Sequence, residues 1–539
     1  MTPIQYHVSL ANPHAHLFNI ELRIPAPDHD GQTVSLPAWI PGSYMIRDFA
    51  KNIEQFAVSS SGGQLKWEKL DKQTWRCEPC VGPLIIRYQV YAWDLSVRAA
   101  HFDTTHAYFN GTSLFLRVHG QDATPLQVEI ERPDTAIATG WTVATSMLVE
   151  DVDVDGFGLY QAEDYSDLID HPVEIGLLTL LEFTLQGVTH RMAIYGRHQA
   201  DTQRLEHDLS KVCGQHSTMF GELPLDRYLF LVMAVGDGYG GLEHKNSTSL
   251  LCNRDDLPNA DSAANGEGYR RFLGLCSHEY FHLWNVKRIQ PEVFRNQNMD
   301  REIHTRLLWV SEGITSYYDD LGLVRSACIE PKEYLALLAN TITRVMRGKG
   351  RLKQSVAESS FDAWTRFYKQ DENAPNAIVS YYTKGALVAL ALDLTLRIET
   401  EGECSLDDVM RALWMRNGRT GIGLKEGVVE ALVAEISGQD MKEFFAHAVY
   451  GTTDLPLNSL LQYVGIEMHL RPSRDDEDMG GCVEKFGSTN ARSVLGVRMQ
   501  EGQDTVIGTI FEGGAAQAAG LSAGDQIMAV NGIKATALN

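Results

Sequence analysis

The stretch R-F-L-G-L-C-S-H-E-Y-F-H-L-W-N-V-K-R-I, residues 271–289, decides how the rest of this chain is interpreted. Its apolar residues recur at helical spacing, which predicts a helix over 269–289. His278 and His282 are four positions apart, so both lie on one face of that helix and can bind one metal ion. Glu279 can reach a water bound to that ion. The pattern H-E-x-x-H predicts a zinc hydrolase.

A catalytic zinc usually has three protein ligands and a water, so a third ligand is expected nearby. The segment W-V-S-E-G-I-T-S-Y-Y, residues 309–318, offers Glu312 on a second predicted helix. By itself, Glu312 could be a solvated surface carboxylate. The residues around it are apolar, however, and a buried carboxylate needs a partner such as a cation. We therefore expect Glu312 to be the third ligand.

The first third of the chain alternates apolar and polar residues with a period of two. F-N-I-E-L-R-I at 18–24 and L-Q-V-E-I at 126–130 are examples. This alternation is typical of strands with one buried face, and many short strands between Gly and Pro turns indicate a sandwich. We predict an N-terminal antiparallel β-sandwich domain over residues 1–175.

The middle of the chain changes character after this domain. Residues 227–251 predict two strands joined by a glycine-rich turn. Strands followed by helices indicate an α+β core with a helical continuation, which we place at 176–470. The predicted helices after the first one cover residues 302–325, 331–348, 383–398 and 425–449.

The acidic stretch R-P-S-R-D-D-E-D-M-G-G, residues 471–481, is expected to be a linker. Short β runs with small-residue turns follow it, and we place a third, β-rich domain at 485–539. The fold class predicted for the whole chain is multidomain α+β.

Composition limits the partners and the compartment. The 539 residues carry a formal net charge of −23, which disfavours nucleic acid and anionic membranes as partners. Eight cysteines are scattered along the chain, and Cys77 and Cys80 have no second pair that would complete a zinc ribbon. We see no signal-peptide pattern or membrane-spanning segment, so we expect a soluble, cytoplasmic protein with reduced thiols.

The two motifs, H-E-Y-F-H and W-V-S-E-G, resemble those of the gluzincin peptidases, which are similar to aminopeptidase N. His282 and Glu312 are 30 positions apart, farther than in aminopeptidase N relatives. Together with D-L-I-D-H-P-V-E-I-G at 167–176 and the C-terminal module, they make the chain resemble the glycyl aminopeptidase family of PDZ-containing zinc metallopeptidases. The resemblance implies a thermolysin-like zinc peptidase core, one zinc ion per chain and peptide substrates with small N-terminal residues, glycine or alanine.

The segment G-G-L-E-H-K-N, residues 240–246, resembles the glycine-rich exopeptidase motif of aminopeptidase N relatives. The resemblance implies that Glu243 binds the free α-amine of the substrate. Gly240 and Gly241 would let the substrate backbone come close. In the relatives an asparagine often follows this glutamate directly, whereas in this chain His244, Lys245 and Asn246 follow Glu243. A merely solvated turn is the alternative interpretation.

The segment S-Y-Y-T-K-G, residues 380–385, resembles the tyrosine segment of the same relatives. The match places Tyr382 as the phenol that donates to the oxyanion, and Tyr381 takes that role if the register shifts by one. For either tyrosine, a structural position in the core of a helix is the alternative.

The C-terminal segment resembles a PDZ domain. Leu495-Gly496-Val497 matches the carboxylate-binding loop, and residues 513–532 match the core of bacterial versions. Only 49 residues remain from position 491, so we expect a truncated module that lacks the helix forming one wall of the peptide groove.

These motifs predict a zinc aminopeptidase in which Glu279 is the general base, and Tyr382 and zinc stabilise the oxyanion. Two alternatives stay open at this point. One is a zinc endopeptidase with the same site, in which Glu243 meets no amine. The other is a non-catalytic peptide-binding scaffold built on the sandwich and the PDZ module, against which the intact H-E-x-x-H pattern argues.

Overall fold

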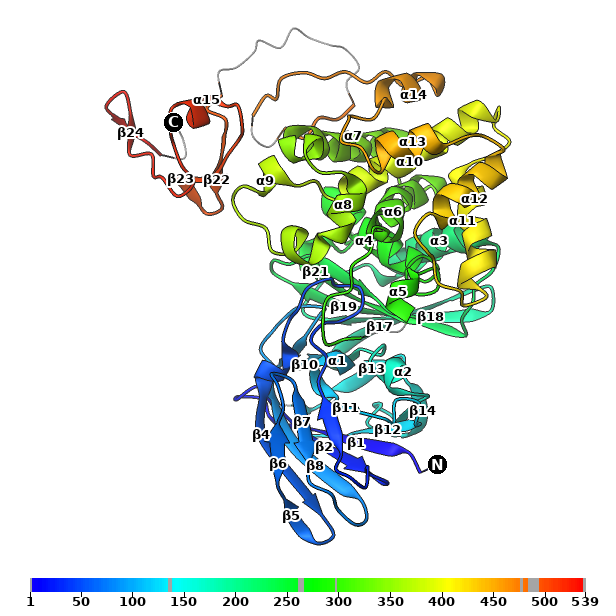
Figure 1. Cartoon of the computed structure of the whole chain (residues 1–539), viewed down its shortest axis with the longest axis vertical. Helices are drawn as coiled ribbons and strands as arrows, with labels where there is room; N and C mark the ends of the chain where they lie inside the picture. The colour runs from blue at the N-terminus through cyan, green and yellow to red at the C-terminus, as the bar shows by residue number, and fades with distance from the viewer. Residues whose placement is uncertain are drawn as a thin grey trace. The chain divides into compact units, whose positions relative to one another are not determined.

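A computed structural model describes most of the chain and confirms the multidomain α+β class (Figure 1). The described residues are 2–133, 138–259, 266–295, 298–475, 478–482 and 494–536. The chain divides into two compact units. Unit 1 comprises Met1–Thr218, Glu222–Leu283 and Gln297–Glu302; unit 2 comprises Met219–Gly221, Trp284–Asn296 and Ile303–Asn539.

The N-terminal part of unit 1 is built of strands, as predicted (blue and cyan in Figure 1). An eight-stranded sheet has the order β14-β15-β12-β1-β2-β8-β4-β5. The alternating segment at 18–24 lies in β2, where Phe18, Ile20, Leu22 and Ile24 are buried. The strands are β1 Ile4–Asn12, β2 Leu17–Ile24, β4 Ile53–Ser60, β5 Gly63–Leu65, β8 Leu84–Tyr91, β12 Leu126–Ile130, β14 Leu148–Val152 and β15 Gly158–Ala162.

One pair in this sheet departs from the predicted antiparallel arrangement. β1 and β12 run parallel, with Ile4 opposite Leu126. Two strands joined by a tight hairpin must be antiparallel, but strands this far apart in the chain are free of that constraint. Alternation reports which face of a strand is buried and carries no information on its direction.

Two four-stranded sheets complete the β-rich part, with the orders β13-β16-β10-β9 and β11-β3-β7-β6. Their strands are β3 Thr33–Ser35, β6 Trp67–Lys69, β7 Thr74–Cys77, β9 Ala100–Phe102, β10 His106–Phe109, β11 Arg117–Val118, β13 Thr142–Thr145 and β16 Val173–Gly176. Two single-turn helices lie between strands: α1 Gly111–Leu114 between β10 and β11, and α2 Tyr165–Leu168 between β15 and β16.

A five-stranded sheet with the order β17-β18-β19-β21-β20 forms the second part of unit 1. The strands β18, β19 and β21 are parallel, and β17 and β20 are antiparallel edge strands. Their bounds are β17 Leu178–Leu185, β18 Val188–Tyr195, β19 Arg227–Val235, β20 Gly240–Glu243 and β21 Ser247–Asn253. The prediction of two strands over 227–251 was wrong, because Gly240 and Gly241, which were assigned to the turn, belong to an edge strand of their own.

Two helices accompany this sheet, α3 Thr202–Phe220 and α4 Glu267–Phe281, and α4 packs against β20 and β21. The helix predicted to reach residue 289 therefore ends eight residues early. His282 is its C-cap, and Val286 has a φ of 106°, which a helix does not allow. Leu283 and Trp284 are fully buried in the turns that follow α4. Apolar residues at these positions fit the helical spacing although the backbone there is not helical, so the predicted helix was too long.

Unit 2 is helical, and its central helix is α10, Thr383–Glu399, which is buried along most of its length. The prediction for 302–325 began too early, because the helical backbone starts with a π-helical turn, η4, at Trp309–Gly313. The prediction for 425–449 covers two helices, α12 and α13. The main helices are α6 Ile314–Arg325, α7 Pro331–Arg347, α8 Val356–Phe361, α11 Leu406–Leu413, α12 Val428–Ser437, α13 Lys442–Ala448 and α14 Leu457–Tyr463.

The C-terminal module of unit 2 contains few regular elements. They are β22 Val497–Gln500, β23 Gln503–Ile510, α15 Ala515–Ala518, β24 Ala529–Val530 and β25 Ile533–Lys534. The predicted loop at 495–497 lies beside α15, since the Ala516 amide donates to the Leu495 carbonyl at 2.8 Å. Part of the predicted linker, residues 476–477, lies outside the described residues. The three domain boundaries stay predictions.

Across the described ranges, no helix combines the length and the apolarity that a bilayer crossing requires.

Candidate functional site

The two histidines of the H-E-x-x-H motif lie together at the end of α4. Their ring centroids are 4.6 Å apart, and the ring planes are nearly perpendicular at 88°. His282 is only 1% exposed. Its backbone N–H donates to the carbonyl of His278 at 3.3 Å, which completes the last helical turn. The i and i+4 arrangement expected from the sequence is therefore present, while the metal-binding role of the pair stays a prediction.

Glu279 lies directly against the edge strand β20. A Cβ atom added to Gly241 would be 2.0 Å from Oε1 of Glu279, a distance at which no side chain fits. Glu279 is 5% exposed. A glycine at position 241 therefore makes room for the Glu279 carboxylate. From the sequence we expected this glycine to make room for the substrate backbone.

A neighbouring arginine fixes the strand on its other side. Arg98 donates from Nη2 to the carbonyl oxygen of Gly241 at 3.2 Å, and its Nη1 lies 3.4 Å from the place of a Cβ on Gly240. The strand position of both glycines is thus held by α4 and by Arg98. Arg98 drew no attention in the sequence because no motif surrounds it.

Glu243 is the last residue of β20, at the free edge of the five-stranded sheet. Its side chain is 3% exposed, and Oε1 has no hydrogen-bond partner among the described residues. A Cβ on Gly42 would lie 2.5 Å from Oε2 of Glu243, so a second glycine is required for this carboxylate. A buried carboxylate oxygen without a donor is costly, and a ligand with a positive charge would satisfy it.

Three groups of this part of unit 1 converge on one point. Ligand atoms of Glu243, Glu279 and His282 all lie within 4.8 Å of one another. The end of an edge strand and the last turn of a helix therefore combine two buried carboxylates with an imidazole, which suits a cationic ligand.

The turn after Glu243 is held by a residue of the segment 167–176. Asp170 accepts a hydrogen bond from the Lys245 amide at 2.7 Å, and its other oxygen lies 3.4 Å from Nδ1 of His244. The Thr248 hydroxyl donates to the carbonyl of Leu242 at 3.0 Å. The sequence analysis singled out segment 167–176 but gave it no role. In the structure, Asp170 of this segment holds the turn at His244 and Lys245, where relatives often have an asparagine after the glutamate.

Unit 2 holds Glu312 in the π-helical turn η4, where the side chain is 2% exposed. A π turn frees backbone carbonyls from the regular helical pattern, and such turns are frequent at functional sites. The amide of Asn285 donates to the carbonyls of Val310 at 2.9 Å and Ser311 at 3.0 Å. Asn285 thus stabilises the irregular backbone that carries Glu312.

Two glycines bring η4 and α10 into direct contact. A Cβ on Gly313 would lie 2.6 Å from Cα of Gly385, and a Cβ on Gly385 would lie 2.8 Å from Cα of Gly313. The glycines of the W-V-S-E-G and Y-T-K-G motifs therefore serve one helix contact within unit 2.

Tyr382 is the residue directly before α10. Burial and, after it, the charge of Glu312 raise the pKa of the Tyr382 phenol well above its usual range. The Tyr368 hydroxyl lies 3.3 Å from the Tyr382 hydroxyl. A phenol with a raised pKa stays protonated and can donate a hydrogen bond. Tyr381 is fully buried, with its ring 4.9 Å from that of Phe367.

Comparison with protein-family models gives three matches along the chain. Residues 5–177 match the peptidase M61 N-terminal domain, residues 271–388 match the M61 glycyl aminopeptidase, and residues 487–539 match the PDZ domain. No curated protein matches the chain significantly.

Solved structures extend the comparison to the whole chain. An aminopeptidase N family protein from Idiomarina loihiensis is 42% identical, with a TM-score of 0.95 over 99% of this chain and 90% of its own. An M1 zinc metallopeptidase from Deinococcus radiodurans is 16% identical, with a TM-score of 0.53 over 84% of this chain and 94% of its own. A mutant of that enzyme bound to a Tyr-Ser-Ala substrate gives a TM-score of 0.52 at 16% identity, over 84% of this chain and 94% of its own.

Proposed function

Since the chain belongs to the M61 glycyl aminopeptidase family, we propose that it is a zinc-dependent aminopeptidase that removes small N-terminal residues, such as glycine or alanine, from peptides. The observation that carries the proposal is the buried carboxylate of Glu243, which lies beside Glu279 and has one oxygen without a partner among the described residues. The solved M1 zinc metallopeptidase with a bound tripeptide substrate supports the same class of ligand.

We propose that His278, His282 and Glu312 bind one zinc ion per chain. Two imidazoles and one carboxylate are a donor set that catalytic zinc uses. The rings at the end of α4 and the buried carboxylate in η4 each have the local order that a ligand needs. Zinc bound there would supply Lewis-acid activation of the scissile carbonyl and of water.

Glu279 is the general base of the proposed reaction. It takes the proton of the attacking water and delivers it to the leaving amine. Gly241 lets the edge strand lie close against this carboxylate, and Glu279 is 5% exposed. Burial against the strand limits the motion of the base and lowers the cost of ordering it during the reaction.

Glu243 and Tyr382 orient and stabilise the substrate. The carboxylate of Glu243 receives the α-ammonium group, which satisfies its unpartnered oxygen and allows one residue to extend to the scissile bond. The protonated phenol of Tyr382 donates a hydrogen bond to the oxyanion that develops at the carbonyl.

A screen of aminoacyl fluorogenic substrates, with and without a chelator, tests this function. We expect chelator-sensitive cleavage of glycyl and alanyl substrates and weak cleavage of N-acetylated peptides. Equal cleavage of free and acetylated peptides would favour the endopeptidase alternative, and no cleavage at any zinc concentration would favour the binding scaffold.

Elemental analysis tests the zinc ligands independently of activity. Glu312→Ala should lose zinc, because two imidazoles alone bind it weakly. The control is Glu435→Ala, which removes an exposed carboxylate paired with Arg416 and should keep one zinc per chain. Equal zinc content in the two variants would remove Glu312 as a ligand.

A further inference from the structure

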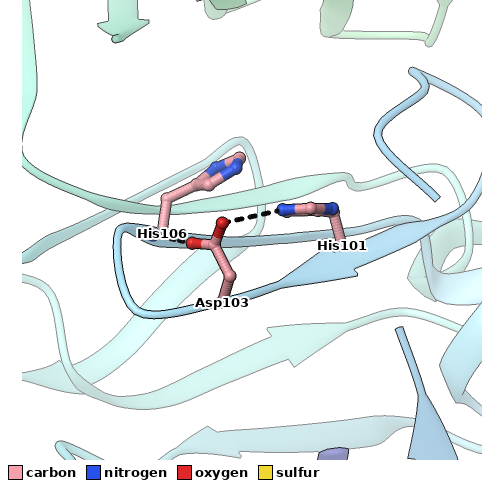
Figure 2. A group of neighbouring side chains, drawn as sticks. All are labelled: His101, Asp103 and His106. Carbon is pink, nitrogen blue, oxygen red and sulfur yellow. Dashed lines mark hydrogen bonds and ion pairs between the residues drawn. The ribbon is translucent and has the colours of Figure 1, made fainter. Parts of the chain in front are cut away.

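A second group of histidine and carboxylate side chains lies on the hairpin that joins β9 and β10. His101 lies on β9, Asp103 in the turn and His106 at the start of β10, as Figure 2 shows. Nε2 of His101 is 3.3 Å from Oδ2 of Asp103, and ligand atoms of all three residues lie within 4.8 Å of one another. His101 and His106 are 5% and 1% exposed. We call these three residues the hairpin cluster.

Residues outside the hairpin cluster hold its side chains. Nδ1 of His106 lies 2.8 Å from Oε1 of Glu174, a fully buried carboxylate on β16, so Nε2 of His106 remains for a ligand. A carboxylate that holds the far nitrogen of a ligating histidine is a common feature of metal sites, because it fixes the ring and its tautomer.

Asp103 is oriented in the same manner. Its Oδ1 accepts hydrogen bonds from the Thr105 amide at 2.7 Å, the Thr105 hydroxyl at 2.6 Å and the His106 amide at 3.2 Å. These three donors occupy one oxygen and direct the other, Oδ2, toward His101 (Figure 2). The turn therefore presents a single carboxylate oxygen to the cluster.

Aromatic rings fix the planes of both imidazoles. The Tyr195 ring stacks on His106 with centroids 3.6 Å apart and planes 9° apart. The Trp93 ring stacks on His101 at 4.9 Å and 30°. The imidazoles therefore need little reorganisation to bind a ligand.

The hairpin cluster opens onto a cavity of about 480 Å³. Trp93 and Tyr195 line this cavity together with the three cluster residues. Arg197 and Arg254 also line it, and Nε of Arg254 donates to the carbonyl of Val235 at 3.3 Å. An ion can enter from the cavity, and an anion that completes its coordination would meet positive charge there.

We propose that His101, Asp103 and His106 form a second metal site of this protein, for a divalent transition-metal ion such as zinc or cobalt. Two imidazoles and one carboxylate suit these ions, and ligand atoms around tetrahedral zinc are about 3.3 Å apart. His101 and Asp103 are hydrogen-bonded at 3.3 Å, so a metal ion could replace the shared proton with little change in the separation of the two atoms. The site shares no residue with the proposed peptidase zinc site.

An exposed group elsewhere in unit 1 provides the contrast. Asp28, His29 and Asp30 also bring three ligand atoms within 4.8 Å, but all three residues are exposed. Of these two groups, the hairpin cluster has stacked rings, a buried carboxylate on His106 and three donors on one oxygen of Asp103. His29→Gln is therefore the matched control for substitutions in the hairpin cluster.

Metal stoichiometry of the full chain tests the proposal. Chelator-treated protein is titrated with Co²⁺, with visible absorption as the readout, and elemental analysis after dialysis counts bound zinc. We expect two equivalents in the wild type, one in the His278→Gln/His282→Gln variant and none when His101→Gln is added to it. The His29→Gln variant should still bind two.

Two results would overturn the second site. One is that the His278→Gln/His282→Gln variant binds no metal, and the other is that it still binds one equivalent after His101→Gln is added. A measurement that leaves the hairpin intact guards against loss of folding. Zinc should raise the Tm of the His278→Gln/His282→Gln variant, since a ligand that binds only the folded state stabilises it. An unchanged Tm at saturating zinc would contradict the proposal. Neither result depends on peptidase activity, so the two proposals fail separately.

Discussion

The residues that we propose for the peptidase chemistry are held in different ways within each unit. In unit 1, Glu243 ends an edge strand, and Glu279 and His282 lie in the last turn of a regular helix or at its cap. In unit 2, Glu312 lies in a π turn, and Tyr382 precedes a helix whose first turns pack on that π turn. Regular secondary structure positions the first set, and irregular backbone with close glycine contacts positions the second.

Because of this difference, we expect substitutions in unit 1 to affect mainly catalysis and substitutions in unit 2 to affect also the local fold. In unit 1, a substitution that keeps the shape of a carboxylate removes its chemistry and leaves strand and helix in place. In unit 2, Glu312 and Tyr382 lie on elements held by the contact between Gly313 and Gly385, so we expect a methyl group added at either glycine to displace them.

Glu279→Gln should reduce kcat by about 10²–10⁴-fold, because the amide keeps the shape of the carboxylate but cannot accept a proton. Zinc content and Tm should stay near wild type, since Glu279 is not a proposed ligand. Steady-state kinetics and elemental analysis measure both quantities. A near-normal kcat would place the general base elsewhere and break the assignment of unit 1 chemistry.

Glu243→Ala should lower kcat/KM for free peptides by roughly two to three decades, since truncating one partner of a buried charge pair costs about 2–5 kcal/mol. The substrate ammonium would be left desolvated and unpaired. N-acetylated peptides have no ammonium, so their low turnover should hardly change. An unchanged ratio of free to acetylated turnover would show that another group binds the amine.

Tyr382→Phe should reduce kcat by about 10²-fold with little change in KM, as expected for a donor used mainly in the transition state. Tyr381→Phe is the matched variant, and a larger loss there would shift the oxyanion role by one residue.

The pH dependence of the same tyrosine gives an independent test. Because the folded-state pKa of Tyr382 is raised above its usual 10.0, the phenol stays protonated through neutral and mildly alkaline pH. Stability that depends on the neutral phenol is present below pH 10 and is lost as pH rises through the raised pKa. Because Tyr382 does not lose its proton in this range, any fall of kcat with rising pH below pH 10 should be the same in wild type and in Tyr382→Phe. A fall that disappears in the variant would contradict the raised pKa.

Gly313→Ala should destabilise the protein by about 1–3 kcal/mol, because the new methyl group meets the backbone of Gly385 at 2.6 Å. Gly214→Ala is the control, since it lies inside α3 with only an ordinary 3.6 Å contact to Leu185. Alanine there should be neutral or stabilising by up to about 1 kcal/mol. Denaturant unfolding measures both, and equal effects would remove the special role of the glycine contact.

Much of the fold followed from the sequence. Alternation in 18–24 predicted the buried face of β2, and helical spacing predicted the existence of α4, α7 and α10. Boundaries were less predictable where residues are buried without being helical, as at Leu283 and Trp284. The edge strand β20 was missed because its glycines indicated a turn, whereas their small size serves Glu279.

In the candidate site as well, residues within local motifs were predicted and residues from remote parts of the chain were not. The residues of H-E-x-x-H were predicted because four residues make one helical turn, and Glu243 was predicted from the resemblance of G-G-L-E to the exopeptidase motif; their roles stay predictions. Gly42 and Arg98 were missed, and Asp170 was singled out within 167–176 without a role, since each meets β20 or its turn from a remote part of the chain. The hairpin cluster was missed for the same reason. Its spacing H-x-D-x-x-H becomes meaningful only when β9 pairs with β10.

The sequence by itself determined the chemistry that local geometry can bring together: two imidazoles one helical turn apart, and a glutamate beside them. The tertiary structure alone decided which glycines must lack a side chain, which remote residues hold the strand, and that Glu312 lies in a π turn stabilised by Asn285. The physical reason is range. Helical and strand periodicities act over a few residues, whereas steric exclusion and buried hydrogen bonds depend on atoms that only the folded chain brings within contact.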